Sequence, residues 1–63
     1  MKTRVITVNI EKERELYDEL MLAMTNHTKY DGCYIMQYME HRGGEGQMVG
    51  EFMLREDKED QPV

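Results

Sequence analysis

The sequence predicts a single α+β domain in which one helix packs on a three-stranded, mainly antiparallel sheet. Three observations support this fold class: an apolar stripe at helical spacing, three short segments rich in β-branched or alternating apolar residues, and turn residues between them. Their order, β-α-β-β, suggests a crossover helix followed by a hairpin, with the first strand beside the third and antiparallel to it. At 63 residues the chain has room for one domain, which we place at residues 1–55.

The first predicted strand covers residues 3–9 (TRVITVN), where β-branched residues dominate. Ile6, Val8 and Ile10 recur at every second position, so they share one face and are expected to point into the core. Asn9 ends the strand at a position where its side chain can accept a hydrogen bond from the first turn of a helix. We therefore expect a helix to follow this strand directly.

The predicted helix covers residues 10–27 and has one apolar and one acidic side. At about 100° per residue, the apolar side holds Leu16, Tyr17, Leu20, Ala23, Met24 and His27. The acidic side holds Glu11, Glu15 and Asp18, with Glu19 at its border. Leu22 falls among these acids, where an apolar side chain gains nothing from the fold.

Like charges recur at helical spacing on the acidic side. Glu11–Glu15 and Glu15–Glu19 are pairs four residues apart, and each costs roughly 0.2–0.5 kcal/mol of helix stability. Arg14 and Asp18 form a favourable pair at the same spacing. Two interpretations stay open: the fold tolerates this small cost, or the acids form a binding surface.

The second predicted strand, residues 33–40 (CYIMQYME), is apolar on both faces. One face holds Cys33, Ile35 and Met39, and the other holds Tyr34, Met36 and Tyr38. A strand with one solvated face should alternate apolar with polar residues, so both faces are expected to be covered. Which face packs on the helix stays open, because a one-residue slip exchanges the two faces.

A single helix covers only one face of the predicted sheet, and a soluble monomer rarely leaves an apolar face open. We therefore expect a homodimer, formed through the open sheet face or an edge strand. The residues expected in the dimer contact are Tyr34, Met36, Tyr38 and Met53.

Turn residues separate the remaining elements. Asp31-Gly32 predicts a tight turn, and residues 41–46 (HRGGEG) predict a glycine-rich hairpin loop. The third strand is predicted at residues 47–55, and Gly50 inside it suggests a bulge or the close approach of another backbone. One side of this strand holds Met48, Phe52 and Leu54. Residues 56–63 lack apolar periodicity and are expected to form a disordered acidic tail.

The net charge of −5 limits the classes of partner. Residues 1–30 are balanced in charge, so residues 31–63 supply the whole excess of acids. An acidic protein repels nucleic acid and anionic membranes and is attracted to basic surfaces, so we expect no direct binding to nucleic acid or membrane. The single Cys33 cannot form an internal disulfide, which favours a reducing, cytoplasmic location.

No residue pattern indicates a catalytic, metal or cofactor site. The chain contains no serine, which excludes a Ser-His-Asp triad. The spacing of His27, His41 and Cys33 matches no zinc pattern, so no metal is expected. The glycines of residues 41–46 do not open a helix, and Glu45 would repel a phosphate group. We therefore expect neither enzymatic activity nor a cofactor.

Two classes of function fit these observations. In the first, the protein is a non-enzymatic inhibitor that places carboxylates on the DNA- or RNA-binding site of a basic, nucleic-acid-binding host protein. The residues expected to contact that partner are Glu11, Glu15, Asp18, Glu19, Leu22, Glu45 and Glu51, with Leu22 as an apolar anchor. In the second, the protein is a homodimeric adaptor or regulator that uses its Tyr/Met surface, and the acids only keep it soluble.

In its short length, acidic helix, acidic tail and lack of catalytic residues, the chain resembles the small acidic host-takeover proteins of bacteriophages, including DNA mimics. The resemblance covers the whole chain but includes no specific motif, so it assigns no role to any residue. It implies inhibition of a host protein by imitation of the DNA backbone, in the cytoplasm of a bacterial host.

Overall fold

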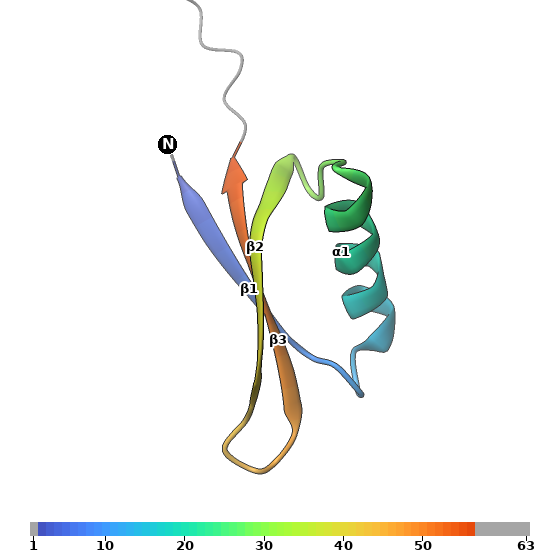
Figure 1. The fold of residues 1–63 in the computed structure, drawn as a ribbon, viewed down its shortest axis with the longest axis vertical. Helices are drawn as coiled ribbons and strands as arrows, with labels where there is room; N and C mark the ends of the chain where they lie inside the picture. Colours follow the sequence, from blue (N-terminus) through green and yellow to red (C-terminus); the bar gives the residue numbers. More distant parts are fainter. Residues whose placement is uncertain (1, 57–63) are drawn as a thin grey trace, which may run out of the picture.

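The computed structural model describes residues 2–56. It contains β1 (Thr3–Asn9), α1 (Arg14–Asn26), β2 (Cys33–Arg42) and β3 (Met48–Glu56). The three strands form one sheet in the order β1-β3-β2 with antiparallel neighbours, and α1 packs on one face of it (Figure 1). The predicted β-α-β-β order and the pairing of the first strand with the third are confirmed. Within residues 2–56 no helix or strand covers the opposite face, which we call the open face.

β1 has the predicted bounds, whereas the hairpin of β2 and β3 is longer than predicted. β2 continues to Arg42, because Arg42 still pairs with Met48 of β3. The loop is therefore shortened to residues 43–47, and it is closed by a hydrogen bond from Gly43 N to Gln47 O (2.6 Å). This end of the hairpin extends beyond α1 (Figure 1).

β3 reaches one residue past the predicted end of the domain. It continues to Glu56, whose backbone N donates a hydrogen bond to Lys2 O (3.1 Å). The remaining residues of the predicted tail, 57–63, lie outside the described residues.

The chain reverses between β1 and α1 in a turn at residues 10–13, which the prediction had included in the helix. Ile10 stays attached to the sheet, because its backbone N donates to a carbonyl of β3 (3.1 Å) and its side chain is buried. Asn9 Oδ1 accepts hydrogen bonds from the backbone N of Glu11 (3.1 Å) and of Lys12 (2.9 Å). Asn9 therefore caps this turn, as its residue type favours, and the helix proper starts later.

α1 has 13 residues and is bounded at both ends by residues with non-helical geometry. Glu13, before it, has φ −115° and ψ 48°, and His27, after it, has a left-handed φ of 58°. The prediction that His27 lies on the apolar side of the helix is wrong, because His27 follows the last helical residue and is exposed. Residues 2–56 contain no helix long and apolar enough to cross a membrane.

A β-bulge at Met36 decides which residues of β2 face the helix. Ile35 pairs with Leu54 and Gln37 pairs with Met53, so Met36 is an extra residue in β2. Before the bulge, Cys33 and Ile35 face α1. Because the bulge shifts the alternation by one residue, Tyr38 also faces α1, whereas Gln37 and Met39 lie on the open face. The prediction that Met39 shares a face with Cys33 and Ile35 is therefore wrong.

The core lies between α1 and the covered face of the sheet. Its fully buried side chains are Val8, Leu20, Cys33, Phe52 and Leu54. These come from all four elements and include apolar residues that periodicity predicted for the core sides of β1, α1 and β3. The predicted inward side of β1 is confirmed, and on α1 Leu16, Tyr17, Leu20 and Ala23 lie toward the core as predicted, whereas His27 does not.

Gly50 makes room for aromatic side chains in this core. A Cβ atom on Gly50 would lie 3.1 Å from Tyr38 Cε1 and 3.6 Å from Tyr17 Cδ1. The Tyr38 and Phe52 ring centroids are 4.7 Å apart, and Tyr17 lies 6.2 Å from Tyr38. The close approach at Gly50 is therefore that of a tyrosine ring and not of another backbone.

Candidate partner-binding surfaces

The outer side of α1 carries a group of exposed acids. Glu15, Asp18 and Glu19 lie on the solvent side of α1, and Leu22 lies among them with 62% of its surface exposed. Glu11 is also exposed, but it belongs to the turn before α1. The predicted like-charge pair Glu11–Glu15 is therefore not a helical pair, and only Glu15–Glu19 has that spacing within α1. We call Glu11, Glu15, Asp18 and Glu19 the acidic helix surface.

The excess of acid in the described residues comes entirely from the segment 11–26. This segment holds five acids, Glu11, Glu13, Glu15, Asp18 and Glu19, against two bases, Lys12 and Arg14. The rest of residues 2–56 holds five acids and five bases, so the sheet and loops are balanced. A partner approaching α1 therefore meets an anionic surface, and a partner approaching the sheet meets a neutral one.

Two of the helix acids have no ion pair within residues 2–56. Asp18 Oδ1 lies 3.3 Å from Arg14 Nε, as the predicted pair requires, and the Arg14 guanidinium also lies over the Tyr17 ring at 5.4 Å. Glu15 and Glu19 form no ion pair with any other of residues 2–56. Their carboxylates are exposed and can pair with an external cation without breaking a contact within the described part of the chain.

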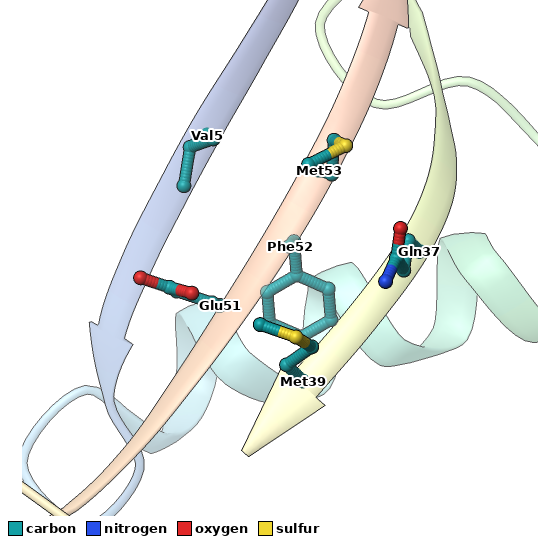
Figure 2. A pocket seen from close by; sticks show the side chains of 6 residues that line it. All are labelled: Val5, Gln37, Met39, Glu51, Phe52 and Met53. Atoms are coloured by element: carbon teal, nitrogen blue, oxygen red, sulfur yellow. The ribbon is translucent and has the colours of Figure 1, made fainter. Parts of the chain in front are cut away.

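The other two predicted contact acids lie away from this surface. Glu45 is in the loop at residues 43–47, where its backbone N donates to Gln47 Oε1 (3.1 Å). Glu51 lies on the open face, half-buried, with Oε2 3.8 Å from His41 Nε2. The sheet lies between Glu51 and α1 (Figure 2), so the structure does not bring Glu51 together with the helix acids.

The open face carries most of the exposed apolar side chains. Val5, Met36 and Met39 are 56%, 55% and 49% exposed, and Tyr34 and Met53 are also exposed. A shallow depression on this face is lined by Val5, Gln37, Met39, Glu51, Phe52 and Met53, with α1 behind the sheet (Figure 2). Apolar side chains gathered in this way are typical of a protein contact.

Tyr38 does not lie with the other residues predicted for the dimer contact. Tyr34, Met36 and Met53 are on the open face, whereas the bulge turns Tyr38 toward α1. The Tyr38 hydroxyl donates to Glu40 Oε1 (2.9 Å) and lies 3.5 Å from the Tyr17 hydroxyl. Burial raises the pKa of Tyr38, and the hydrogen bonds to Tyr17 and Glu40 raise it further. Tyr38 is thus a partly buried residue that packs against the core, and its hydroxyl has hydrogen-bond partners.

Sequence reasoning missed a polar cluster at the start of β2. Arg4 Nη1 donates to Asp31 Oδ2 (3.1 Å) and lies 3.8 Å from Cys33 Sγ, and these contacts raise the pKa of Arg4. Asp31 and Gly32 have φ of 53° and 78°, and the backbones of Tyr30 and Cys33 exchange two hydrogen bonds across them. The cluster therefore joins β1 to a tight two-residue turn.

Metal-ligating side chains do not gather in the described region. Among residues 2–56, no group of three His, Cys, Asp or Glu side chains could hold a metal ion. Cys33 is a free thiol and is buried in the core.

Comparison of the chain with models of protein families, with curated proteins and with solved structures found no match in any of the three.

Proposed function

We propose that the protein is a non-enzymatic binding protein whose acidic helix surface occupies the nucleic-acid site of a basic protein, as a DNA mimic does. The observation that carries this proposal is the position of the charge. The whole net charge of residues 2–56 lies in the segment 11–26, on the side of the molecule that α1 presents to solvent. A basic groove built for phosphates attracts such a surface by the same long-range electrostatics that attract DNA.

The carboxylates of this surface are suited to pairing with a partner. Glu15 and Glu19 repel each other at i,i+4 spacing, which costs roughly 0.2–0.5 kcal/mol in the free protein. A lysine or arginine of the partner placed between them removes this repulsion and gains two charge-assisted contacts. Binding to a cationic surface therefore offsets a small cost that the isolated fold carries.

Leu22 supplies an apolar contact inside the charged surface. It is the most exposed large hydrophobic side chain among residues 2–56 and lies about one turn after Asp18 and Glu19 on the same side of α1. Next to these acids an apolar side chain can act as an interface anchor, because the charges orient the partner while the apolar contact excludes water. We assign Leu22 that role.

The test of this proposal is capture of a partner by the tagged full chain from bacterial lysate, washed across a salt series and identified by mass spectrometry. We expect a basic nucleic-acid-binding protein that is retained at low salt and lost at high salt, because salt screens exposed charge pairs. An acidic or neutral partner that stays bound at high salt would overturn the proposal.

Matched variants locate the contact. Glu15→Gln with Glu19→Gln removes two charges from the acidic helix surface, and Glu45→Gln with Glu56→Gln removes two charges elsewhere. The first pair is expected to weaken capture by about tenfold or more, and the second pair by much less, because only the first lies on α1. Equal effects of the two pairs would show that only the total charge matters.

A second candidate is an adaptor that binds a partner through the exposed side chains of the open face. The exposure of Met36 and Met39 favours this candidate, because flexible apolar side chains adapt to different surfaces. If the adaptor candidate is right, added salt does not weaken capture of the partner. The double variant Met36→Lys with Met39→Lys should then abolish capture. The acidic helix surface would then serve only to keep the protein in solution.

A further inference from the structure

We propose that the open face packs against the open face of a second copy of this chain. The two copies are related by a two-fold axis that lies between the two faces, runs perpendicular to the strands and passes over Met53. The inference rests on the strand register and not on the partner proposed above. It deepens the general expectation of a dimer by naming the face, the axis and the residues that meet.

On the open face, β3 carries opposite charges at equal distances on either side of Met53. Glu51, Met53 and Arg55 occupy alternate positions of β3 and therefore share this face. A two-fold axis across the strands reverses the strand direction, so it places Glu51 of each copy opposite Arg55 of the other. An axis along the strands would instead oppose like charges. The charge pattern therefore selects both the second copy and its orientation.

The neighbouring strands fit the same axis. Val5 of β1 and Gln37 of β2 are the register partners of Met53, so all three lie in the row on the axis and meet their own copies. On β2, Tyr34 is in the row of Arg55 and Met39 is in the row of Glu51. The axis therefore places the exposed Met39 of each copy against the exposed Tyr34 ring of the other, which is a favourable sulfur–aromatic arrangement.

The size of the face determines the strength of the dimer. Three strands about 4.8 Å apart and seven residues at about 3.3 Å each give a face of roughly 14 by 23 Å. This is less than the roughly 800 Å² per partner that stable complexes bury, so the dimer should form reversibly in the micromolar to millimolar range. Because α1 lies on the other side of the sheet, each copy keeps its acidic helix surface exposed (Figure 1).

Sedimentation equilibrium of the full chain, from micromolar to millimolar concentration, tests the arrangement through a charge exchange. Glu51→Arg alone and Arg55→Glu alone each oppose like charges and should raise the dissociation constant by about tenfold or more. The double variant Glu51→Arg, Arg55→Glu should return to the wild-type value. An equimolar mixture of the two single variants should associate more tightly than either variant by itself.

The matched control is Glu45→Arg, which makes the same charge change in the loop and should leave the dissociation constant unchanged. Circular dichroism of each variant confirms that the fold is kept. A wild-type protein that stays monomeric up to millimolar concentration would overturn the proposal. So would single variants that dimerise like the wild type, or a double variant that fails to recover. None of these outcomes depends on capture of a partner, so the proposed function is judged separately.

Discussion

Tyr38 of β2 and Gly50 of β3 are diagonal neighbours on the same face of the sheet, and their positions depend on each other. The Tyr38 ring packs at a tilt against Phe52 and passes so close to Gly50 that a Cβ there would lie only 3.1 Å away. The glycine of β3 thus allows the tyrosine of β2 to lie inward, and the ring covers backbone that a glycine leaves bare. Single residues, rather than average hydrophobicity, decide the packing at this end of the sheet.

We expect Gly50→Val to lower the free energy of unfolding by about 1–3 kcal/mol, because the new methyl groups overlap the space of the Tyr38 ring. Urea denaturation at neutral pH measures the change. Gly44→Val is the control, since a Cβ at Gly44 meets nothing within 4 Å, and it should change stability by less than about 0.5 kcal/mol. Equal stability of the two variants would show that the ring does not need this space.

The raised pKa of Tyr38 predicts a loss of stability at high pH. The pKa of Tyr38 is higher in the folded protein than in the unfolded chain, where it is 10.0, so the folded protein holds the hydroxyl proton more tightly. Tyr38 therefore stabilises the fold below pH 10, and this contribution is lost as the pH rises above 10. Urea midpoints measured one unit below and one unit above pH 10 should therefore differ. Tyr38→Phe should reduce the difference, and Tyr34→Phe, which alters an exposed residue, should not. If Tyr38→Phe shows the same difference between the two urea midpoints as the wild type, the raised pKa of Tyr38 does not cause the loss of stability.

At the scale of elements, periodicity predicted β1 well because its β-branched residues alternate without interruption. The faces of β2 could not be predicted in the same way. With unbroken alternation, the Cys33 face would bury Gln37 and the Tyr34 face would bury Glu40. The bulge at Met36 turns Gln37 to the open face by changing the alternation in mid-strand, whereas Glu40 stays on the side of α1, where it is exposed and accepts a hydrogen bond from the Tyr38 hydroxyl. No local signal in the sequence marks the bulge, and the apolar residues on both faces led only to the expectation that both faces are covered.

The start of α1 shows a similar competition between local signals and the tertiary fold. Asn9 and the acids after it are typical of a helix N-terminus, and Asn9 does cap a turn. The backbone of Ile10, however, donates to β3, which holds the chain at the sheet for another residue. The helix therefore begins at Arg14, and Glu11 lies outside it.

Deletion of Met36 is expected to be tolerated, because it removes the extra residue and leaves Ile35 and Tyr38 on the helix side in a regular strand. The free energy of unfolding should change by less than about 1 kcal/mol. Deletion of Tyr34 also removes one exposed residue, but it turns Ile35 away from α1 or moves Cys33 out of the core. That deletion should cost about 3 kcal/mol or more. Equal stabilities in urea denaturation would mean that the bulge does not set the faces of β2.

At the scale of the whole molecule, the sheet separates two surfaces of different character. One is the acidic helix surface, which holds the net charge of the described residues. The other is the open face, which is apolar at its centre and carries opposite charges at Glu51 and Arg55. The helix acids could be predicted from spacing alone, because a helix presents one periodic side to solvent. The alternation of β3 likewise puts Glu51 on the side opposite Phe52, so its separation from the helix acids could also be read from the sequence.

We propose separate roles for the two sides. Self-association through the open face leaves both helices outward, so a dimer would present two acidic helix surfaces to a partner or to two partners. The proposed contact with a basic protein therefore does not compete with dimerisation.

The measurement that tests the proposed function most directly asks whether DNA and this protein exclude each other from the same partner. Labelled duplex DNA is bound to the captured partner, the full-length protein is titrated in, and fluorescence anisotropy reports the release of the DNA. We expect complete release by the wild type, and about tenfold more protein needed for Glu15→Gln with Glu19→Gln, because the carboxylates replace phosphates on a shared site. A stable complex in which the partner holds the DNA and this protein together would contradict the account.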